Sequence, residues 1–165
     1  ATHRGAAVSG TVGSDEKVAL AKANGYAQVL NIRNDVWVKR VRELTGGEGV
    51  PVVYDSVGKD TFAGSLDCLA VRGMLVSFGN ASGAVPPFEP GILSAKGSLY
   101  LTRPTLVSYT RTAKEIQETA ADLLAVIVSG AGKIAVHHRF KLSEAHKAHE
   151  ALQSRGTTGA TGLIP

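Results

Sequence analysis

The segment from Val52 to Asn80 constrains the fold of this chain most, because it has the pattern of a β-α-β unit. It opens with an apolar run that stops at Asp55, crosses a helix-length stretch and closes with a second apolar run from Met74 to Gly79. Both runs are nearly continuous, which is typical of strands covered on both faces in a parallel sheet. The crossover has Asp60 as its expected N-cap and carries one apolar stripe for packing on the sheet. That stripe has i, i+4, i+7 spacing: Phe62, Leu66 and Leu69.

Small and polar residues follow each of the two predicted strands. Ser56-Val57-Gly58 come after the first run, and Phe78-Gly79-Asn80 stand at the end of the second. In open parallel sheets, ligands bind beyond the carboxyl ends of the strands. These two groups of residues are therefore the expected edge of a binding site.

Strand and helix patterns alternate along the rest of the chain. Short strands are predicted over residues 6–12, 29–30, 98–102, 134–142 and 162–164. The predicted helices begin with N-cap candidates or a capping box. These are Ser14, Asn34 or Asp35, the pair Thr112 and Glu115, and Ser143. This alternation predicts an α/β fold with a doubly wound, mostly parallel sheet.

Composition narrows the class of protein. Hydrophobic residues make up 44% and charged residues 19% of the 165 residues, so a disordered chain and a coiled coil are both disfavoured. No apolar run approaches the ~20 residues of a membrane span, and the first residues, ATHRG, have no apolar signal-peptide core. The single cysteine, Cys68, excludes an internal disulfide and a cysteine-rich zinc site within these residues. We expect a cytoplasmic protein that does not bind membranes.

The formal charge of +4 raises the question of nucleic acid and metal partners. Its basic residues are dispersed and lack interleaved aromatic residues, so nucleic-acid binding is disfavoured as the main function. A modest positive field suits a phosphate-rich cofactor equally well. His137 and His138 are adjacent on a predicted strand and point to opposite faces. His146 and His149 would need help from carboxylates, so no metal site is expected.

Five motifs occur in the same order, over essentially the whole chain, as in one known family. They are GTVGSDEK, LTGGEGVPVVYDSVG, LVSFGNASGAV, KGSLYLTRP and AHEALQSRGTTG. Together they resemble the zeta-crystallin-like NADPH:quinone oxidoreductases of the medium-chain dehydrogenase/reductase superfamily. The resemblance implies a Rossmann-type domain, NADPH as cofactor, and hydride transfer to a quinone or an enone.

The resemblance also implies that part of the family pattern is absent. Gly10-Thr11-Val12-Gly13 has the wrong spacing for the Gly-rich phosphate turn and matches the end of the second strand of such a domain. The chain is therefore expected to be a C-terminal fragment without the first strand and that turn, and to be inactive alone. Residues 1–132 would form the incomplete dinucleotide-binding domain, and residues 133–165 a return segment of the catalytic domain.

At the adenosine end, the resemblance places Gly13 and Ser14 beside the ribose, gives Ser14 and Lys17 the contacts to the 2′-phosphate of NADPH, and puts Arg155 near the same phosphate. A hydroxyl and an ammonium stand where an NAD-dependent protein would have an acidic residue. Relatives often have a Tyr where this chain has Ile32, which cannot donate a hydrogen bond. Arg33 would compensate by stacking or by charge, and we expect a weaker preference for NADPH over NADH than in relatives.

At the nicotinamide end, the resemblance places five residues of the two strand-end groups: Ser56, Val57, Phe78, Gly79 and Asn80. Hydride transfer is chemistry of the cofactor, so no catalytic acid or base is expected within this segment. The strand from Ser98 to Thr102 is expected to pair with its twofold mate in a homodimer, which would cover an apolar edge formed by Leu99 and Leu101.

Two other classes of function stay open on the sequence. One is a non-catalytic dimerising or RNA-binding module, which a gel-shift assay with AU-rich RNA at several salt concentrations would detect. The other is a zinc-type alcohol dehydrogenase whose metal ligands lie outside this chain. The SFGNASG stretch disfavours the second, only by resemblance.

Overall fold

The computed structural model describes residues 2–33, 36–132, 134–154 and 157–165. These residues form two compact units, Ala1–Arg111 and Thr112–Pro165. None of the helices within the described ranges is long and apolar enough to cross a membrane.

The first unit begins with a short 3-10 helix, η1 (Thr2–Arg4), and a β-α-β unit. Strands β1 (Ser9–Val12) and β2 (Gln28–Asn31) are parallel neighbours, and α1 (Glu16–Ala23) connects them. Helix α2 (Trp37–Leu44) follows β2. Parallel neighbours put their carboxyl ends at one edge, so the segments after Val12 and after Asn31 lie next to each other.

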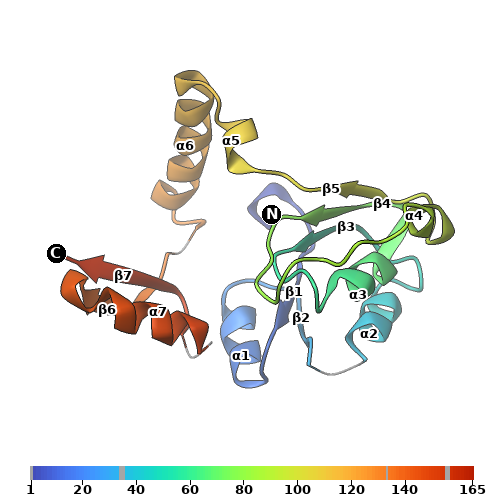
Figure 1. Cartoon of the computed structure of the whole chain (residues 1–165), viewed down its shortest axis with the longest axis horizontal. Helices are drawn as coiled ribbons and strands as arrows, with labels where there is room; N and C mark the ends of the chain where they lie inside the picture. The colour runs from blue at the N-terminus through green and yellow to red at the C-terminus, as the bar shows by residue number, and fades with distance from the viewer. Residues whose placement is uncertain (1, 34–35, 133, 155–156) are drawn as a thin grey trace. The chain divides into compact units, whose positions relative to one another are not determined.

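The second ladder of this unit contains the segment that the sequence marked as central. Strands β3 (Val50–Asp55), β4 (Leu69–Ser77) and β5 (Tyr100–Thr102) are parallel and adjacent in that order (Figure 1). Three short helices complete the unit: α3 (Phe62–Asp67), α4 (Gly91–Ala95) and α5 (Leu106–Tyr109). The predicted α/β class with parallel strands is confirmed.

No strand pairing joins β1 to β3 among the residues that the structure describes, so the five strands form two ladders. In a doubly wound sheet of strand order 3-2-1-4-5-6, the first strand lies between the second and the fourth. With β1 and β2 taken as the second and third strands, the break between the ladders falls where that order places the first strand.

The hydrophobic core lies on one face of the three-stranded ladder, under α3 and α4. Its buried members come from α3, from β4 and from the position before β5: Phe62, Leu66, Leu69, Leu75 and Leu99. The other face carries the alternate side chains, which are exposed: Val52, Tyr54, Met74 and Tyr100. The prediction that both faces of these strands are covered is therefore wrong within this unit, because helices pack on only one face.

Several predicted helix starts are wrong by one residue. The residue before α1 is Asp15 rather than Ser14, the residue before α3 is Thr61 rather than Asp60, and α7 follows Glu144 rather than Ser143. None of these three has a side-chain cap hydrogen bond, so no capping side chain marks these starts. The candidates Asn34 and Asp35 lie outside the described residues.

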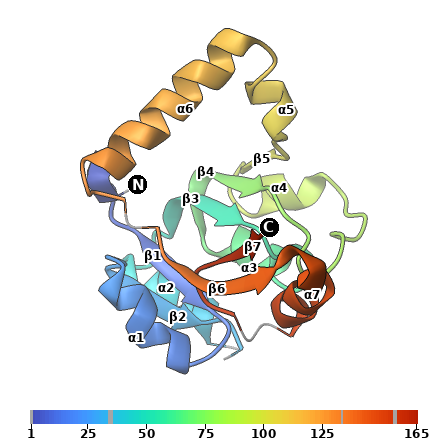
Figure 2. The ribbon, with the colours of Figure 1, turned by 90° about the vertical axis from the view of Figure 1, so that its left-hand side faces the viewer.

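In the second unit, the capping box predicted for the long helix is confirmed. Thr112 accepts from the backbone N–H of Glu115, whose carboxylate accepts from the N–H of Thr112, at the start of α6 (Ala113–Val128). The rest of this unit is β6 (Val136–Lys141), the 3-10 helix η2 (Leu142–Glu144), α7 (Ala145–Gln153) and β7 (Ala160–Ile164). Strands β6 and β7 are parallel, and α7 packs on them through the buried Ala148 (Figure 2).

Candidate functional site

A buried polar site of the first unit surrounds the carboxylate of Asp55, the last residue of β3. Asp55 is buried and accepts hydrogen bonds from the backbone N–H groups of Val57 at 2.8 Å and Gly58 at 3.0 Å. Its other contacts come from the hydroxyl of Thr61 at 2.8 Å and the hydroxyl of Ser65 at 2.8 Å. Since Thr61 directly precedes α3 and Ser65 lies within it, the carboxylate fixes the path of the chain from β3 into that helix.

The loop after β3, residues 56–60, is joined to the loop after β4, residues 78–83. The backbone N–H and the hydroxyl of Ser82 both donate to the carbonyl of Val57 at 2.8 Å, and the N–H of Ala81 donates to the carbonyl of Ser56 at 3.2 Å. The Ser82 hydroxyl in turn accepts from the N–H of Asp60 at 3.0 Å. We call these two segments the paired loops. Each limits the movement of the other because they share these bonds.

Two glycines allow the paired loops to approach so closely. A Cβ on Gly79 would overlap the carbonyl oxygen of Ser56 and lie 2.7 Å from its Cα. Gly58 has φ +88°, and a Cβ there would be 2.7 Å from the carbonyl oxygen of Gly83. Only glycine fits at either position without moving the backbone.

The structure brings together most residues that were expected at the nicotinamide end. Ser56, Val57, Gly79 and Asn80 all belong to the paired loops. Phe78 is tied to the same place through its N–H, which donates to the carbonyl of Asp55 at 2.9 Å, while its side chain is 49% exposed. Its ring is thus available to a ligand beyond the strand ends.

The residues expected at the adenosine end follow β1 and β2. Gly13, Ser14 and Lys17 lie in the turn and first part of α1, and a Cβ on Gly13 would meet nothing within 4 Å. Arg33 is two residues past the end of β2, and its N–H donates to the side-chain oxygen of Asn31 at 3.0 Å. The pairing of β1 with β2 therefore brings Arg33 to the same edge as Gly13.

The acidic side chain of Asp15 also lies at this edge. The Asn31 amide donates to the carboxylate of Asp15 at 2.9 Å, so that carboxylate is held toward β2. Arg155, the remaining predicted contact to the phosphate, lies outside the described residues.

The sequence did not identify the polar residues that support the paired loops: Asp55, Thr61, Ser65 and Ser82. One signal was present, since an Asp at the end of an apolar strand followed by Ser-x-Gly favours a turn in which the carboxylate accepts backbone N–H groups. The hydroxyl partners could not be found this way, because they come from a helix and from a loop of other segments.

The described residues contain no group of three or more His, Cys, Asp or Glu side chains that could hold a metal ion. His137 and His138 instead contact Thr158, through its hydroxyl at 3.1 Å and its N–H at 3.2 Å respectively.

Parallel strands with crossover helices, and polar loops at the carboxyl ends of those strands, define a dinucleotide-binding type of α/β domain. The chain belongs to the zinc-binding dehydrogenase family, whose model matches residues 1–127. No donor set for zinc is present among the described residues, so the metal of the family's name does not fit this part of the chain.

Individual relatives agree with the resemblance seen in the sequence. The chain is 52% identical over 163 residues to a quinone oxidoreductase of Salmonella typhimurium, covering 98% of this chain and 50% of that protein. It is 42% identical over 166 residues to a 2-haloacrylate reductase of Burkholderia sp, covering 100% of this chain and 50% of that protein. The predicted likeness to quinone oxidoreductases is confirmed, and the chain spans about half the length of the curated relatives it matches.

A solved structure gives the same result for the fold. The structure of Escherichia coli quinone oxidoreductase complexed with NADPH matches with a TM-score of 0.96 and 48% identity, covering 99% of this chain and 51% of that chain. The predicted Rossmann-type fold is thereby confirmed.

Proposed function

We propose that this chain is the cofactor-binding portion of an NADPH-dependent oxidoreductase that reduces a quinone or an enone. The observation that carries the proposal is the paired loops, which present a fixed backbone at the carboxyl ends of β3 and β4. Support also comes from the relatives, among them a quinone oxidoreductase solved with NADPH and a reductase of 2-haloacrylate, an activated alkene.

The adenosine end has a donor set that suits the 2′-phosphate of NADPH. Gly13 leaves open space beside the end of β1, and Ser14 and Lys17 supply a hydroxyl and an ammonium from the following turn. Arg33 is exposed at the same edge and would add a second cation. Charged donors of this kind favour a phosphate over a free hydroxyl.

Because Ile32 cannot donate a hydrogen bond, discrimination against NADH would depend on Ser14 and on the charges of Lys17 and Arg33. We therefore expect a weaker preference for NADPH than a hydrogen-bonding side chain at position 32 would give. Dissociation constants for NADPH and NADH, compared between the unchanged chain and the Ile32→Tyr variant, would test this. Equal ratios in the two proteins would contradict it.

At the other end, Ser56, Val57, Gly79 and Asn80 would orient the nicotinamide ring, and Phe78 would cover the ribose. NADPH supplies the hydride when bound, and the protein's part is to orient it and exclude water. A loop pair held by Asp55 and Ser82 suits this task because little ordering remains to be done on binding.

The proposal is tested with a fragment of the cofactor whose expected contacts all lie in this chain. Binding of 2′-AMP and 5′-AMP would be compared by isothermal titration. We expect tighter binding of 2′-AMP, and a loss of that preference in Lys17→Gln. The matched control is Lys22→Gln, in the last turn of the same helix. Equal affinity for the two nucleotides, or a Lys22→Gln effect as large as that of Lys17→Gln, would overturn the proposed role.

The predicted domain division is part of the proposal: residues 1–132 belong to the cofactor-binding domain and residues 133–165 to the catalytic domain. This boundary differs from the one between the two compact units of the structure, which falls between Arg111 and Thr112. We expect no reductase activity from the chain alone, measured as NADPH oxidation at 340 nm with 1,4-benzoquinone. Turnover by the isolated chain would show that the pocket for the acceptor is contained in it.

A homodimer through the strand from Ser98 to Thr102 is part of the same proposal. β5 pairs with β4 on one side, and the described residues offer no partner on its other side. The expectation that Leu99 and Leu101 form an exposed apolar edge is wrong, because Leu99 is buried in the core and Leu101 packs against the core. The exposed apolar residue of this edge is Tyr100. Sedimentation showing a monomer at micromolar concentration would contradict the dimer.

A further inference from the structure

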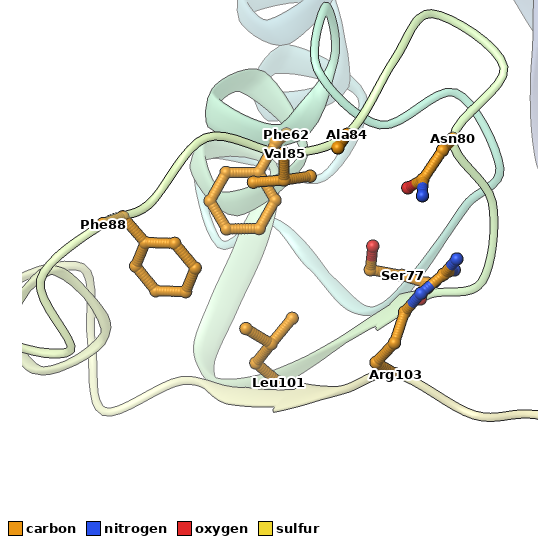
Figure 3. Close-up of a pocket in the computed structure, with 8 residues that line it drawn as sticks. All are labelled: Phe62, Ser77, Asn80, Ala84, Val85, Phe88, Leu101 and Arg103. Carbon is orange, nitrogen blue, oxygen red and sulfur yellow. Dashed lines mark hydrogen bonds between the residues drawn. The ribbon is translucent and has the colours of Figure 1, made fainter.

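A pocket of about 280 Å³ lies beside the paired loops, at the carboxyl ends of β4 and β5. One end of it is apolar. That end is lined by two aromatic and two aliphatic side chains: Phe62, Val85, Phe88 and Leu101. The rings of Phe62 and Phe88 have their centroids 4.9 Å apart and are tilted by 43° (Figure 3). A cavity of roughly 150 Å³ lined by apolar side chains holds benzene, so this pocket has room for a ring with a small substituent.

The other end of the pocket is polar and carries one positive charge. Figure 3 shows Ser77, Asn80 and Arg103 together on the side opposite the two rings. One N–H of the Arg103 guanidinium donates to the carbonyl of Ser77 at 2.8 Å, which fixes the group at the pocket. A guanidinium has five N–H donors and keeps its charge at all accessible pH values. Within the described part of the chain, its other donors have no protein acceptor.

The charge at this end is not balanced from the pocket itself. None of the described residues that line it is acidic. The only ionisable side chain among them is Arg103, and the Asn80 amide adds neutral donors. A planar guanidinium matches the two oxygens of a carboxylate, and such a pair is stronger than a hydrogen bond to a neutral carbonyl.

From this arrangement we propose that the pocket binds a small planar carboxylate, an aromatic or conjugated acid, with its ring packed against the apolar end formed by Phe62 and Phe88 and its carboxylate on Arg103. We call it the carboxylate pocket. The pocket shares Asn80 with the proposed nicotinamide end, but the inference goes beyond the proposed function, since it concerns a ligand that the pocket would bind without any cofactor present. Its failure would leave the 2′-AMP result unchanged, and failure of the 2′-AMP test would leave this pocket untouched.

The test uses three probes that separate the two ends of the pocket. Benzoate carries both the ring and the charge, acetophenone carries the ring with a neutral carbonyl, and acetate carries the charge alone. Isothermal titration of the 165-residue chain should give a benzoate affinity at least 10-fold higher than either of the others. Benzoate binding no tighter than that of acetate or acetophenone would overturn the proposal.

Substitutions locate the binding. Arg103→Gln can still donate to the Ser77 carbonyl, and it should lower benzoate affinity about 10-fold or more while changing acetophenone affinity less than 3-fold. Arg111→Gln, an exposed arginine of the same unit, is the matched control and should leave both unchanged. Unchanged benzoate affinity in Arg103→Gln would contradict the assignment.

A measurement on the unchanged chain keeps the question answerable if Arg103→Gln does not fold. The side-chain Nε–H resonance of Arg103 and the Nδ2 resonances of Asn80 would be followed by NMR during benzoate titration. We expect both to shift in a saturable way that gives the same dissociation constant as the titration. Shifts at other arginines but not at Arg103 would place benzoate elsewhere and overturn the proposal.

Discussion

The two edges of the candidate cofactor site are built differently. After β3 and β4, the paired loops rest on buried groups: Asp55 and Ser65 are each 4% exposed, and Thr61 is 7% exposed. After β1 and β2, the structure buries no residue of α1, and the strands themselves are only partly covered. One edge is held by a polar network inside the protein, and the other is a surface that carries charges.

This difference suits the two ends of a dinucleotide. Orientation of a reacting ring requires donors and backbone held within a fraction of an ångström, which only a packed environment supplies. Selection of a phosphate requires positive charge at the right edge, and long flexible side chains such as Lys17 and Arg33 can provide it from the surface. We therefore expect substitutions at the paired loops to affect stability, and those at the adenosine end to affect binding alone.

The largest effect is expected from Asp55→Ala. It would leave two backbone N–H groups and the hydroxyls of Thr61 and Ser65 buried without their acceptor, at about 3–5 kcal/mol of unfolding free energy. Urea unfolding followed by the fluorescence of Trp37 would measure it, since this single tryptophan packs against Gly64 of α3. Asp60→Ala is the control, because Asp60 is exposed, and should stay within about 0.5 kcal/mol. Equal effects of the two variants would refute the role of Asp55.

A smaller loss is expected from Gly79→Ala, because the added Cβ overlaps the Ser56 carbonyl and would separate the paired loops. We expect about 2–3 kcal/mol in the same unfolding experiment. Gly91→Ala serves as control, since a Cβ there meets nothing within 4 Å. It should be neutral or slightly stabilising, because it replaces a glycine at the start of α4. A neutral Gly79→Ala would mean that the loops can move apart freely.

The third prediction concerns pH and the buried thiol of Cys68, which lies before β4, at the opposite end of the strands from the paired loops. Burial raises the pKa of the Cys68 thiol from 9.0 to about 11, partly offset by the charge of Arg42. The folded state therefore holds this proton more tightly than the unfolded state, and stability should fall as pH rises from about 9 to about 11. In the Cys68→Ala variant, the fall in unfolding free energy over this pH range should be smaller by about 1–2 kcal/mol. Parallel stability curves for both proteins over that pH range would argue against a buried thiol.

The smallest effect on stability is expected at the adenosine end. Lys17→Gln should change the unfolding free energy by less than about 0.5 kcal/mol, because Lys17 is only partly buried and charges open to solvent contribute little. The same variant should remove the preference for 2′-AMP over 5′-AMP. A loss of stability comparable with that of Gly79→Ala would show that this edge is as firmly built as the other.

Much of the fold could be read from local patterns. The runs at Val52 and Met74 became neighbouring parallel strands, and the capping box at Thr112 begins a helix as expected. The grouping of Ser56 and Val57 with Gly79 and Asn80 also followed, because parallel strands end at one edge. The starts of α1, α3 and α7 were each missed by one residue, because no side-chain cap hydrogen bond marks them.

By itself, the sequence determined the α/β class, the parallel order of the strands and the family, since these depend on apolar periodicity and on motifs that are continuous in the chain. The tertiary structure alone decided how the site is supported and where the carboxylate pocket lies. The bonds from Thr61 and Ser65 to Asp55, and the approach of Arg103 to Ser77, join residues from separate segments. Side-chain hydrogen bonds of this kind leave no periodic trace in a sequence, because they depend on where the packed elements bring their atoms together.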